Sequence, residues 1–345
     1  MSPPESLPHP AGAVGSRAAV PLTAPTLADI EAARARIAGV AIRTPLVRLP
    51  IDDAPAEIWL KLENLQPIGS FKLRGAGNAM RLAPPAALAR GVYTASAGNM
   101  AQGVAWNARA LGVPCTVVVP EHAPQTKLDA IARLGGKVVR IPFDDWWRVL
   151  VEHRYAGLDG LFIHPVSNSA VIAGNGTIGL EILEDLPDVD TVVVPFGGGG
   201  LSCGIAAAIR GMADAGRARR PAPRVLAAEV ETAAPLSASL AAGTPMSVEH
   251  TASFVDGIGG KNVLEEMWPL VSALLDGAAV SSVTEIAAAL RLLATRNRVI
   301  AEGAGGAAVA AALAGRAGGG KVVCVVSGGN IDEAKLARIL VGETP

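Results

Sequence analysis

The stretch VVVPFGGGGLSCGIAAAIRG, residues 192–211, joins a run of valines to a helical pattern through four consecutive glycines. The valines suit a strand that is buried on both faces, as the strands of a parallel sheet are. The glycines, Gly197, Gly198, Gly199 and Gly200, let backbone N–H groups turn toward an anion, and the N-terminus of the following helix adds roughly half a positive charge. We therefore predict a phosphate site here, with a flexible turn as the alternative. A nucleotide P-loop is excluded because no Gly-Lys-Ser/Thr follows.

Strand and helix patterns alternate along the chain from about residue 26 onward. Strands are predicted at residues 57–63, 91–96, 114–120, 137–142, 191–196, 224–230 and 321–327, and helices at 27–39, 99–112, 126–136, 201–212, 284–296 and 305–315. Such alternation predicts an α/β fold, and the length suits two lobes, each with a mainly parallel twisted sheet flanked by helices. We assign residues 26–90 and 168–341 to a large domain and residues 91–167 to a small mobile domain. Residues 1–25, rich in Pro, Ala and Ser, are expected to form a disordered extension.

The composition points to a small-molecule partner. Among 345 residues, 30 Lys and Arg nearly balance 31 Asp and Glu, so the chain lacks the excess of positive charge that is typical of a nucleic-acid-binding protein. No run of about 18 apolar residues is long enough to span a membrane. The three cysteines, Cys115, Cys203 and Cys324, have neither a CxxC spacing nor a paired framework. We therefore expect a reducing compartment, the cytoplasm.

A second loop, NLQPIGSFKLRGAGNAM at residues 64–80, contains the lysine best placed for chemistry. Ser70 can cap a helix that has Lys72 in its first turn. The positive end of a helix dipole disfavours an ammonium there, so the neutral amine, which can form an imine, becomes accessible. By contrast, Lys61 lies inside a predicted strand, and Lys137 and Lys321 lie at strand starts. A solvated surface lysine is the alternative for Lys72.

Two more loops follow predicted strands and end in small or polar residues. Ser96, Ala97, Gly98 and Asn99 open a helix, so their N–H groups suit a carboxylate and the Asn99 amide could bond a phenolic oxygen. Ser327 ends the last buried strand, where its hydroxyl can pair with a ring nitrogen. Each loop, taken alone, is also compatible with an ordinary turn.

Together these loops resemble those of the fold type II pyridoxal-phosphate (PLP) enzymes, and in particular the serine/threonine dehydratase and serine racemase family. The matching motifs are SFKLRGA, SAGNMAQGVA, GGGG and SGGN in this order, with HP at 164–165, AVIAGNGTIGLEI at 170–182 and DGI at 256–258. The resemblance runs from about residue 26 to 339. It implies that Lys72, preceded by Phe71 at the cofactor, carries PLP as a Schiff base. It also implies that Asn99 binds the phenolic oxygen, the four glycines the phosphate and Ser327 the pyridine nitrogen, and that the enzyme is a homodimer.

A serine opposite the pyridine nitrogen leaves the ring neutral, and this favours prompt loss of a leaving group from the β carbon. We therefore expect β-elimination of a β-hydroxy-α-amino acid, of the serine or threonine type, to a 2-oxo acid and ammonia. Lys72 would be the base at the α carbon, and the Ser96 to Asn99 loop would hold the substrate carboxylate. A β-replacement enzyme and a non-catalytic phosphate-binding protein are the alternatives.

Departures from the family pattern bear on the substrate. Serine racemases that resemble this chain have a second proton-carrying serine where Ala97 stands, so elimination is favoured over racemisation. Met100 replaces a common histidine and, with Trp146 and Trp147 in the loop after residue 142, would suit a bulkier substrate such as phenylserine. The alternative is that the tryptophans pack the small lobe.

Two more positions are candidate ligand residues. Arg148 could pair a distal carboxylate, as in 3-hydroxyaspartate, or be a surface arginine. Glu229 is a weak candidate for a metal ligand, because Ala233 and Pro235 after it offer no second carboxylate. No metal is expected.

Overall fold

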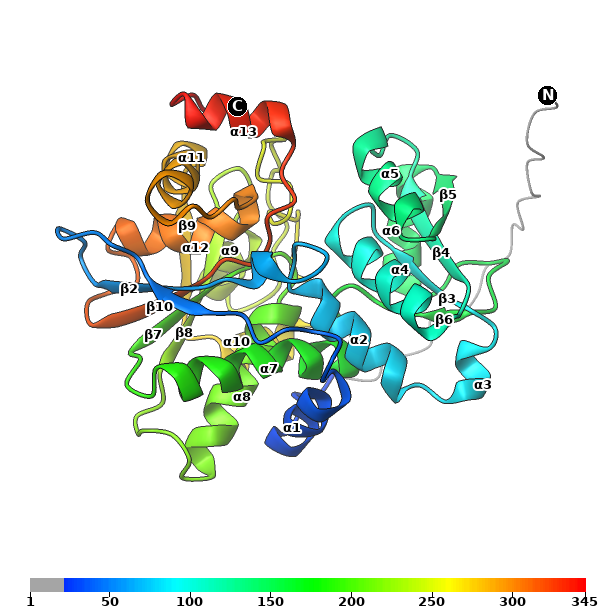
Figure 1. Cartoon of the computed structure of the whole chain (residues 1–345), viewed down its shortest axis with the longest axis horizontal. Helices are drawn as coiled ribbons and strands as arrows, with labels where there is room; N and C mark the ends of the chain where they lie inside the picture. The colour runs from blue at the N-terminus through cyan, green and yellow to red at the C-terminus, as the bar shows by residue number, and fades with distance from the viewer. Residues whose placement is uncertain (1–21) are drawn as a thin grey trace.

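Two separate β-sheets form the centres of two lobes in the computed structural model, which describes residues 22–345 (Figure 1). The six-stranded sheet has the order β1 (Leu46–Arg48), β2 (Glu57–Lys61), β10 (Lys321–Val325), β7 (Thr191–Pro195), β8 (Arg224–Val230) and β9 (Ala278–Ser281). The four-stranded sheet has the order β5 (Lys137–Ile141), β4 (Cys115–Pro120), β3 (Val92–Ala95) and β6 (Leu161–Phe162). Every pairing is parallel except that of β1 with β2. The predicted α/β class with mainly parallel sheets is confirmed.

The helices lie before, between and after these strands. In the first half of the described chain they are α1 (Leu27–Arg36), α2 (Lys72–Leu82), α3 (Pro85–Leu88), α4 (Asn99–Leu111), α5 (Gln125–Arg133), α6 (Phe143–Glu152) and α7 (Ser169–Asp185). In the second half they are α8 (Gly200–Asp214), α9 (Pro235–Ala242), α10 (Trp268–Leu274), α11 (Val283–Leu292), α12 (Gly303–Leu313) and α13 (Glu333–Leu340), with a 3-10 turn at Glu63–Leu65 and a π-helical turn at Leu293–Asn297.

Alternation along the buried strands sends successive side chains to opposite faces of the large sheet. Val192 and Val194 of β7 pack with α1, α7, α8 and α10 on one face. Val193 faces the other side, which α11, α12 and the end of α13 cover. The large lobe is therefore a three-layer α/β/α domain, as its continuous valine runs predict.

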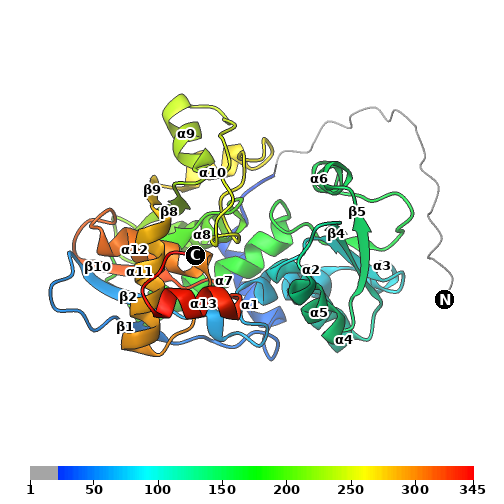
Figure 2. The ribbon, with the colours of Figure 1, turned by 90° about the horizontal axis from the view of Figure 1, so that it is seen from above.

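The small lobe is built in the same way. Val117 of β4 faces α4 and α5, whereas Val118 faces α6. Helix α2 lies between the two lobes, as two views at right angles show, and it packs on both α4 of the small lobe and α7 of the large lobe (Figures 1 and 2). The first helical turn of α2 is therefore held where the lobes meet.

One prediction about the fold is wrong, and two others stay untested. Residues 143–152 form the helix α6, so Trp146 and Trp147 are not in a loop; the stretch FDDWWRVLVE buries Val149 and Leu150, one side of an amphipathic helix. The antiparallel edge strand β1 was not predicted, because three residues are too short for a periodic signal. The expected disordered extension falls mostly on residues 1–21, outside the described residues. The domain boundaries stay a prediction, although the four strands of the small sheet fall within residues 92–162.

No helix within residues 22–345 is long and apolar enough to cross a membrane. The three cysteines are all buried free thiols.

Candidate active site

Lys72 is the first residue of α2, and its amine points to the segment that links the small sheet to α7. Its Nζ donates a hydrogen bond of 2.8 Å to the carbonyl oxygen of Pro165 and lies 5.2 Å from the ring centre of Phe71. Burial lowers the pKa of Lys72 to about 8, against the opposing effect of the Glu302 carboxylate. A substantial fraction of the amine is therefore neutral near pH 8.

The predicted cap of α2 needs a small correction. The N-cap residue is Phe71, one residue later than predicted. Ser70 still contributes, because its Oγ accepts a hydrogen bond of 3.2 Å from the N–H of Lys72.

The glycine loop follows β7 and opens α8, as predicted. Gly199, with φ of +95°, is the N-cap, and no side chain caps the helix. A Cβ on Gly198 would lie 2.8 Å from a methyl carbon of Val166, and one on Gly200 would lie 3.0 Å from the Val166 carbonyl oxygen. The loop therefore packs against the residue next to Pro165, which places it beside the Lys72 amine. Its uncapped N–H groups suit a phosphate.

The loop after β10 lies against the residues that precede α2. The Ser327 carbonyl accepts a hydrogen bond of 3.0 Å from the N–H of Phe71, and Gly328 pairs with Ser70. Ser327 itself is buried. The structure thus brings the predicted lysine and the predicted serine loop together.

Asn99 joins the two lobes at the start of α4. Its Nδ2 donates a hydrogen bond of 2.8 Å to Glu302, and its Oδ1 accepts one of 2.8 Å from Asn330. The N-terminus of α4 has no side-chain cap, and a Cβ on Gly98 would meet no atom within 4 Å. In this loop the N–H of Ser96 bonds the Val118 carbonyl and that of Gly98 bonds the Ser96 hydroxyl oxygen, so the groups that suit a carboxylate are the N–H groups at the uncapped start of α4.

Glu302 is a site residue that the sequence reasoning missed. Its carboxylate is buried, and burial followed by the charge of Asp256 raises its pKa to about 7. A Cβ on Gly328 would lie 2.5 Å from its Oε1, so a side chain there would displace the Glu302 carboxylate. The available signal was an acidic residue shortly before the helix predicted at residues 305–315; in the structure Glu302 is the N-cap residue of α12, and its side chain makes no cap hydrogen bond.

Other predicted ligand residues lie elsewhere or are already engaged. Met100 is 1% exposed and packs in the core between α4 and the small sheet. Trp146 packs on the opposite face of that sheet, against the cluster that contains Tyr93. Arg148 is exposed and pairs with Asp145 of its own helix at 3.2 Å. Its substrate role stays a prediction.

Glu229 does not present a free carboxylate to a metal. Its two oxygens accept hydrogen bonds of 2.8 Å from the N–H groups of Leu236 and Ser237 and one of 2.7 Å from the Ser237 hydroxyl. Burial raises its pKa. The carboxylate therefore stabilises the first turn of α9, and a metal-ligand role for Glu229 stays a weak candidate.

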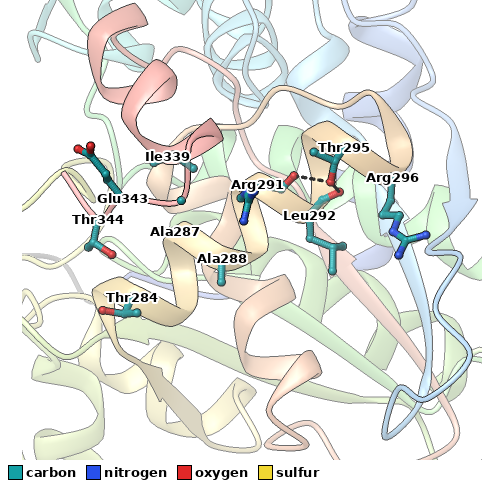
Figure 3. A pocket seen from close by; sticks show the side chains of 11 residues that line it. Thr284, Ala287, Ala288, Arg291, Leu292, Thr295, Arg296, Ile339, Glu343 and Thr344 are labelled. Atoms are coloured by element: carbon teal, nitrogen blue, oxygen red, sulfur yellow. Dashed lines mark hydrogen bonds between the residues drawn. The ribbon is translucent and has the colours of Figure 1, made fainter.

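A cavity of about 350 Å³ lies away from these loops, between α11 and the end of the chain (Figure 3). Arg291 lines it and donates from Nε to the Leu340 carbonyl, at 3.1 Å. None of the predicted site residues lines this cavity.

The four loops together suit PLP. A lysine with a lowered pKa, an uncapped glycine-rich helix start and the buried Ser327 supply an imine-forming amine, a phosphate cradle and a neutral partner for a ring nitrogen. This arrangement on two parallel sheets defines a fold type II PLP enzyme.

Comparisons with known proteins agree with this class. The family described as "Pyridoxal-phosphate dependent enzyme" matches residues 37–328. The L-threonine ammonia-lyase of Thermotoga maritima is 40% identical over 320 residues, covering 91% of this chain and 78% of that protein. The corresponding protein of Geobacter sulfurreducens is 45% identical over 289 residues, covering 82% of this chain and 69% of that protein. The structure of maize serine racemase superimposes with a TM-score of 0.81 at 32% identity, covering 92% of this chain and 98% of that chain.

The chain therefore belongs to the pyridoxal-phosphate dependent enzyme family, in its fold type II serine/threonine dehydratase branch, and it is an ammonia-lyase that uses PLP as cofactor.

Proposed function

We propose that this enzyme converts L-threonine or L-serine to the corresponding 2-oxo acid and ammonia by β-elimination. One observation carries the proposal: Lys72 Nζ bonds the Pro165 carbonyl, next to Val166 on which the glycine loop packs, and it lies near the carboxylate of Glu302, which Asn99 bonds from the start of α4. The names of the relatives, L-threonine ammonia-lyases, support this substrate class.

When bound, PLP withdraws electrons from the α carbon of an attached amino acid and so acidifies its C–H bond. Lys72 would hold the cofactor at rest and, once released, accept the α proton at Nζ. A base with a pKa of about 8 suits this task near neutral pH, because a useful fraction is unprotonated while the basicity stays high. The uncapped start of α4, residues Ser96 to Asn99, would bind the substrate carboxylate and fix which C–H bond faces Lys72.

Elimination removes the α proton and the β hydroxyl as water, and the remaining enamine takes up one water to give the 2-oxo acid and ammonia. The net change is therefore loss of ammonia from the substrate. With Ala97 in the loop before α4, that position has no side-chain proton to deliver to the opposite face of the α carbon, which supports elimination over racemisation.

A bulkier substrate such as phenylserine and a dicarboxylate such as 3-hydroxyaspartate remain candidates for the survey below. The side chains that suggested them, Met100, Trp146 and Arg148, are packed in the small lobe or paired on its surface. We therefore rank threonine and serine first.

The test begins with Lys72→Ala. We expect it to lose both the visible absorption of bound PLP and the formation of 2-oxo acid, while a Lys137→Ala control keeps both. Turnover by the Lys72→Ala protein at the wild-type rate would refute the assignment.

The substrate is decided by steady-state rates with threonine, serine, phenylserine and 3-hydroxyaspartate, with chiral analysis of residual serine and a parallel assay with sulfide. Prompt accumulation of D-serine would indicate a racemase, and a sulfide-dependent product would indicate β-replacement.

We also propose that the enzyme is a cytoplasmic homodimer. The dimer rests on the family resemblance, and sedimentation of the holoenzyme measures it. The compartment rests on the three cysteines, which are buried free thiols.

A further inference from the structure

We propose that His164 is a positioning residue, which holds the Pro165 carbonyl against Lys72 Nζ so that this carbonyl orients the catalytic amine. The inference rests on the proposed function of Lys72 as the α-proton base. It adds a side chain that acts on Lys72 through the backbone of residues 164–167.

The evidence begins with the turn at residues 164–167. The His164 side chain is buried, and its Nδ1 lies 3.1 Å from the Val166 nitrogen and 2.6 Å from the Ser167 nitrogen, both of which donate to it. One imidazole nitrogen therefore closes the turn on both sides of Pro165. The carbonyl of Pro165 is left pointing outward, where it accepts from Lys72 Nζ at 2.8 Å.

These contacts fix the protonation state of His164. A ring nitrogen that accepts two N–H groups carries no proton, so the proton of the neutral ring lies on Nε2. Burial, followed by the nearby charge of His153, lowers the pKa of His164 to about 3. The turn therefore stays closed across the pH range in which the enzyme would work.

The same tautomer argues against a metal at this place. His153, His164 and Glu266 have ligand atoms within 4.8 Å of one another, which is a donor set that zinc accepts. A metal ion needs a free nitrogen lone pair from each histidine. In His164 the backbone occupies Nδ1, and the ring proton occupies Nε2. We therefore interpret the group as a hydrogen-bonded support for the turn.

This support reaches both lobes. His153 ends α6 of the small lobe, stacks on His164 with ring centres 4.5 Å apart, and bonds Glu266 of the large lobe at 3.0 Å. The Ser167 hydroxyl lies 2.8 Å from Nδ1 of His164. The imidazole is thus fixed from two sides.

The consequence for Lys72 follows from hydrogen-bond strength. A carbonyl accepts from the neutral amine, but its bond to an ammonium is about twice as strong. When Nζ takes the α proton, its hydrogen bond to the Pro165 carbonyl therefore becomes stronger as the positive charge develops. This bond stabilises the transition state of proton transfer more than the bound substrate, so it lowers the activation barrier. It also engages one N–H, so the amine lone pair points in a defined direction.

The test compares substitutions at His164 in the full-length holoenzyme. Asparagine places an acceptor oxygen near the position of Nδ1, whereas leucine has a similar volume and no acceptor. His164→Gln, whose amide is one methylene longer, is the second variant if the leucine protein does not fold. His250→Leu is the matched control, because His250 is exposed on the large lobe.

With L-threonine as substrate, we expect His164→Asn to keep kcat within about threefold of the wild type. We expect His164→Leu and His164→Gln to lower kcat about tenfold to a hundredfold with KM little changed. This range corresponds to the loss of one charge-assisted hydrogen bond. Loss of an acceptor that favours the ammonium lowers the pKa of Lys72. The acid limb of the kcat profile therefore moves to lower pH in the leucine variant. Glu302 faces Lys72, and Asp256 and Lys127 act on Glu302; all three stay unchanged in every variant.

A second readout does not use turnover. When PLP is added to the cofactor-free full chain, its visible absorption should return more slowly in His164→Leu than in the wild type. In His164→Asn it should return at about the wild-type rate. If His164→Leu has the wild-type pH profile and the wild-type rate of cofactor binding, the inference is refuted. Calorimetric binding of one zinc ion per chain, lost in His164→Asn, would also overturn it and identify a metal site. A wild-type protein that makes no 2-oxo acid would instead refute the proposed function.

Discussion

Replacement of Arg74 by methionine should destabilise the enzyme strongly, because it unbalances a buried group of charges. Arg74 donates to Glu63 at 2.8 and 2.9 Å and to Glu181 at 2.6 and 2.9 Å, and Lys61 bonds Glu181 at 2.6 Å. All four side chains are buried. Two cations and two carboxylates balance, so the variant leaves one uncompensated negative charge in the core.

The size of the effect follows from this imbalance. Removal of one partner from a buried charge pair costs about 3 to 5 kcal/mol, a large share of the roughly 5 to 15 kcal/mol by which a domain is stable. In the double variant Arg74→Met/Glu63→Gln, Lys61 and Glu181 again balance. We expect it to recover at least about 1 kcal/mol relative to the single variant.

The pH dependence of the free energy of unfolding provides a second test. Burial by itself would raise the pKa of Glu63, but the charge and hydrogen bonds of Arg74 bring it below the ordinary value. In the wild type, this carboxylate contributes stability above its unfolded pKa, and the contribution is lost as pH falls through the folded pKa. Without Arg74 the carboxylate accepts a proton more readily, so the deficit of the variant should shrink toward acid pH.

Urea unfolding followed by far-UV circular dichroism measures these differences. With a slope of about 3 kcal/mol per molar urea, a loss of 3 to 5 kcal/mol moves the midpoint down by about 1 to 1.7 M. An Arg74→Met protein within about 1 kcal/mol of the wild type, or a double variant no more stable than the single one, would show that the charge balance does not hold this core together.

Three more outcomes are expected. Glu302→Gln removes the carboxylate that raises the pKa of Lys72, so the acid limb of the kcat profile should move to lower pH, measured with L-threonine. Gly198→Ala forces a Cβ to 2.8 Å from a methyl group and should weaken PLP binding about tenfold or more in an absorbance titration, the equivalent of an overpacking cost of about 1 to 3 kcal/mol. Gly260→Ala, whose Cβ would meet no atom closer than 3.7 Å, should bind PLP normally. Ala97→Ser restores a hydroxyl in the loop before α4, and D-serine should then form from L-serine, as chiral chromatography would detect.

Much of the fold and several cofactor loops were predictable from sequence because their signals are local. Runs such as those in β7 and β10 specify buried strands, and the glycines, Ser96 to Asn99 and Ser327 each follow a strand directly. The carboxyl ends of parallel strands lie at one edge of a sheet, so loops there gather without further information. Lys72 was identifiable because it opens a helix after such a loop.

Only the tertiary structure decided which groups act on Lys72. Glu302 meets Asn99 across 203 positions of sequence, and the Pro165 carbonyl meets Lys72 across 93. A backbone carbonyl has no sequence signal at all, and His164 shows its role only once its ring is seen to accept from the turn. Helix α6 likewise packs Trp146 against a core cluster of the small lobe, whereas the sequence predicts a loop there. Local patterns fix the conformation of each segment, whereas the pKa of the lysine and the direction of its hydrogen bond depend on contacts that exist only after distant segments pack.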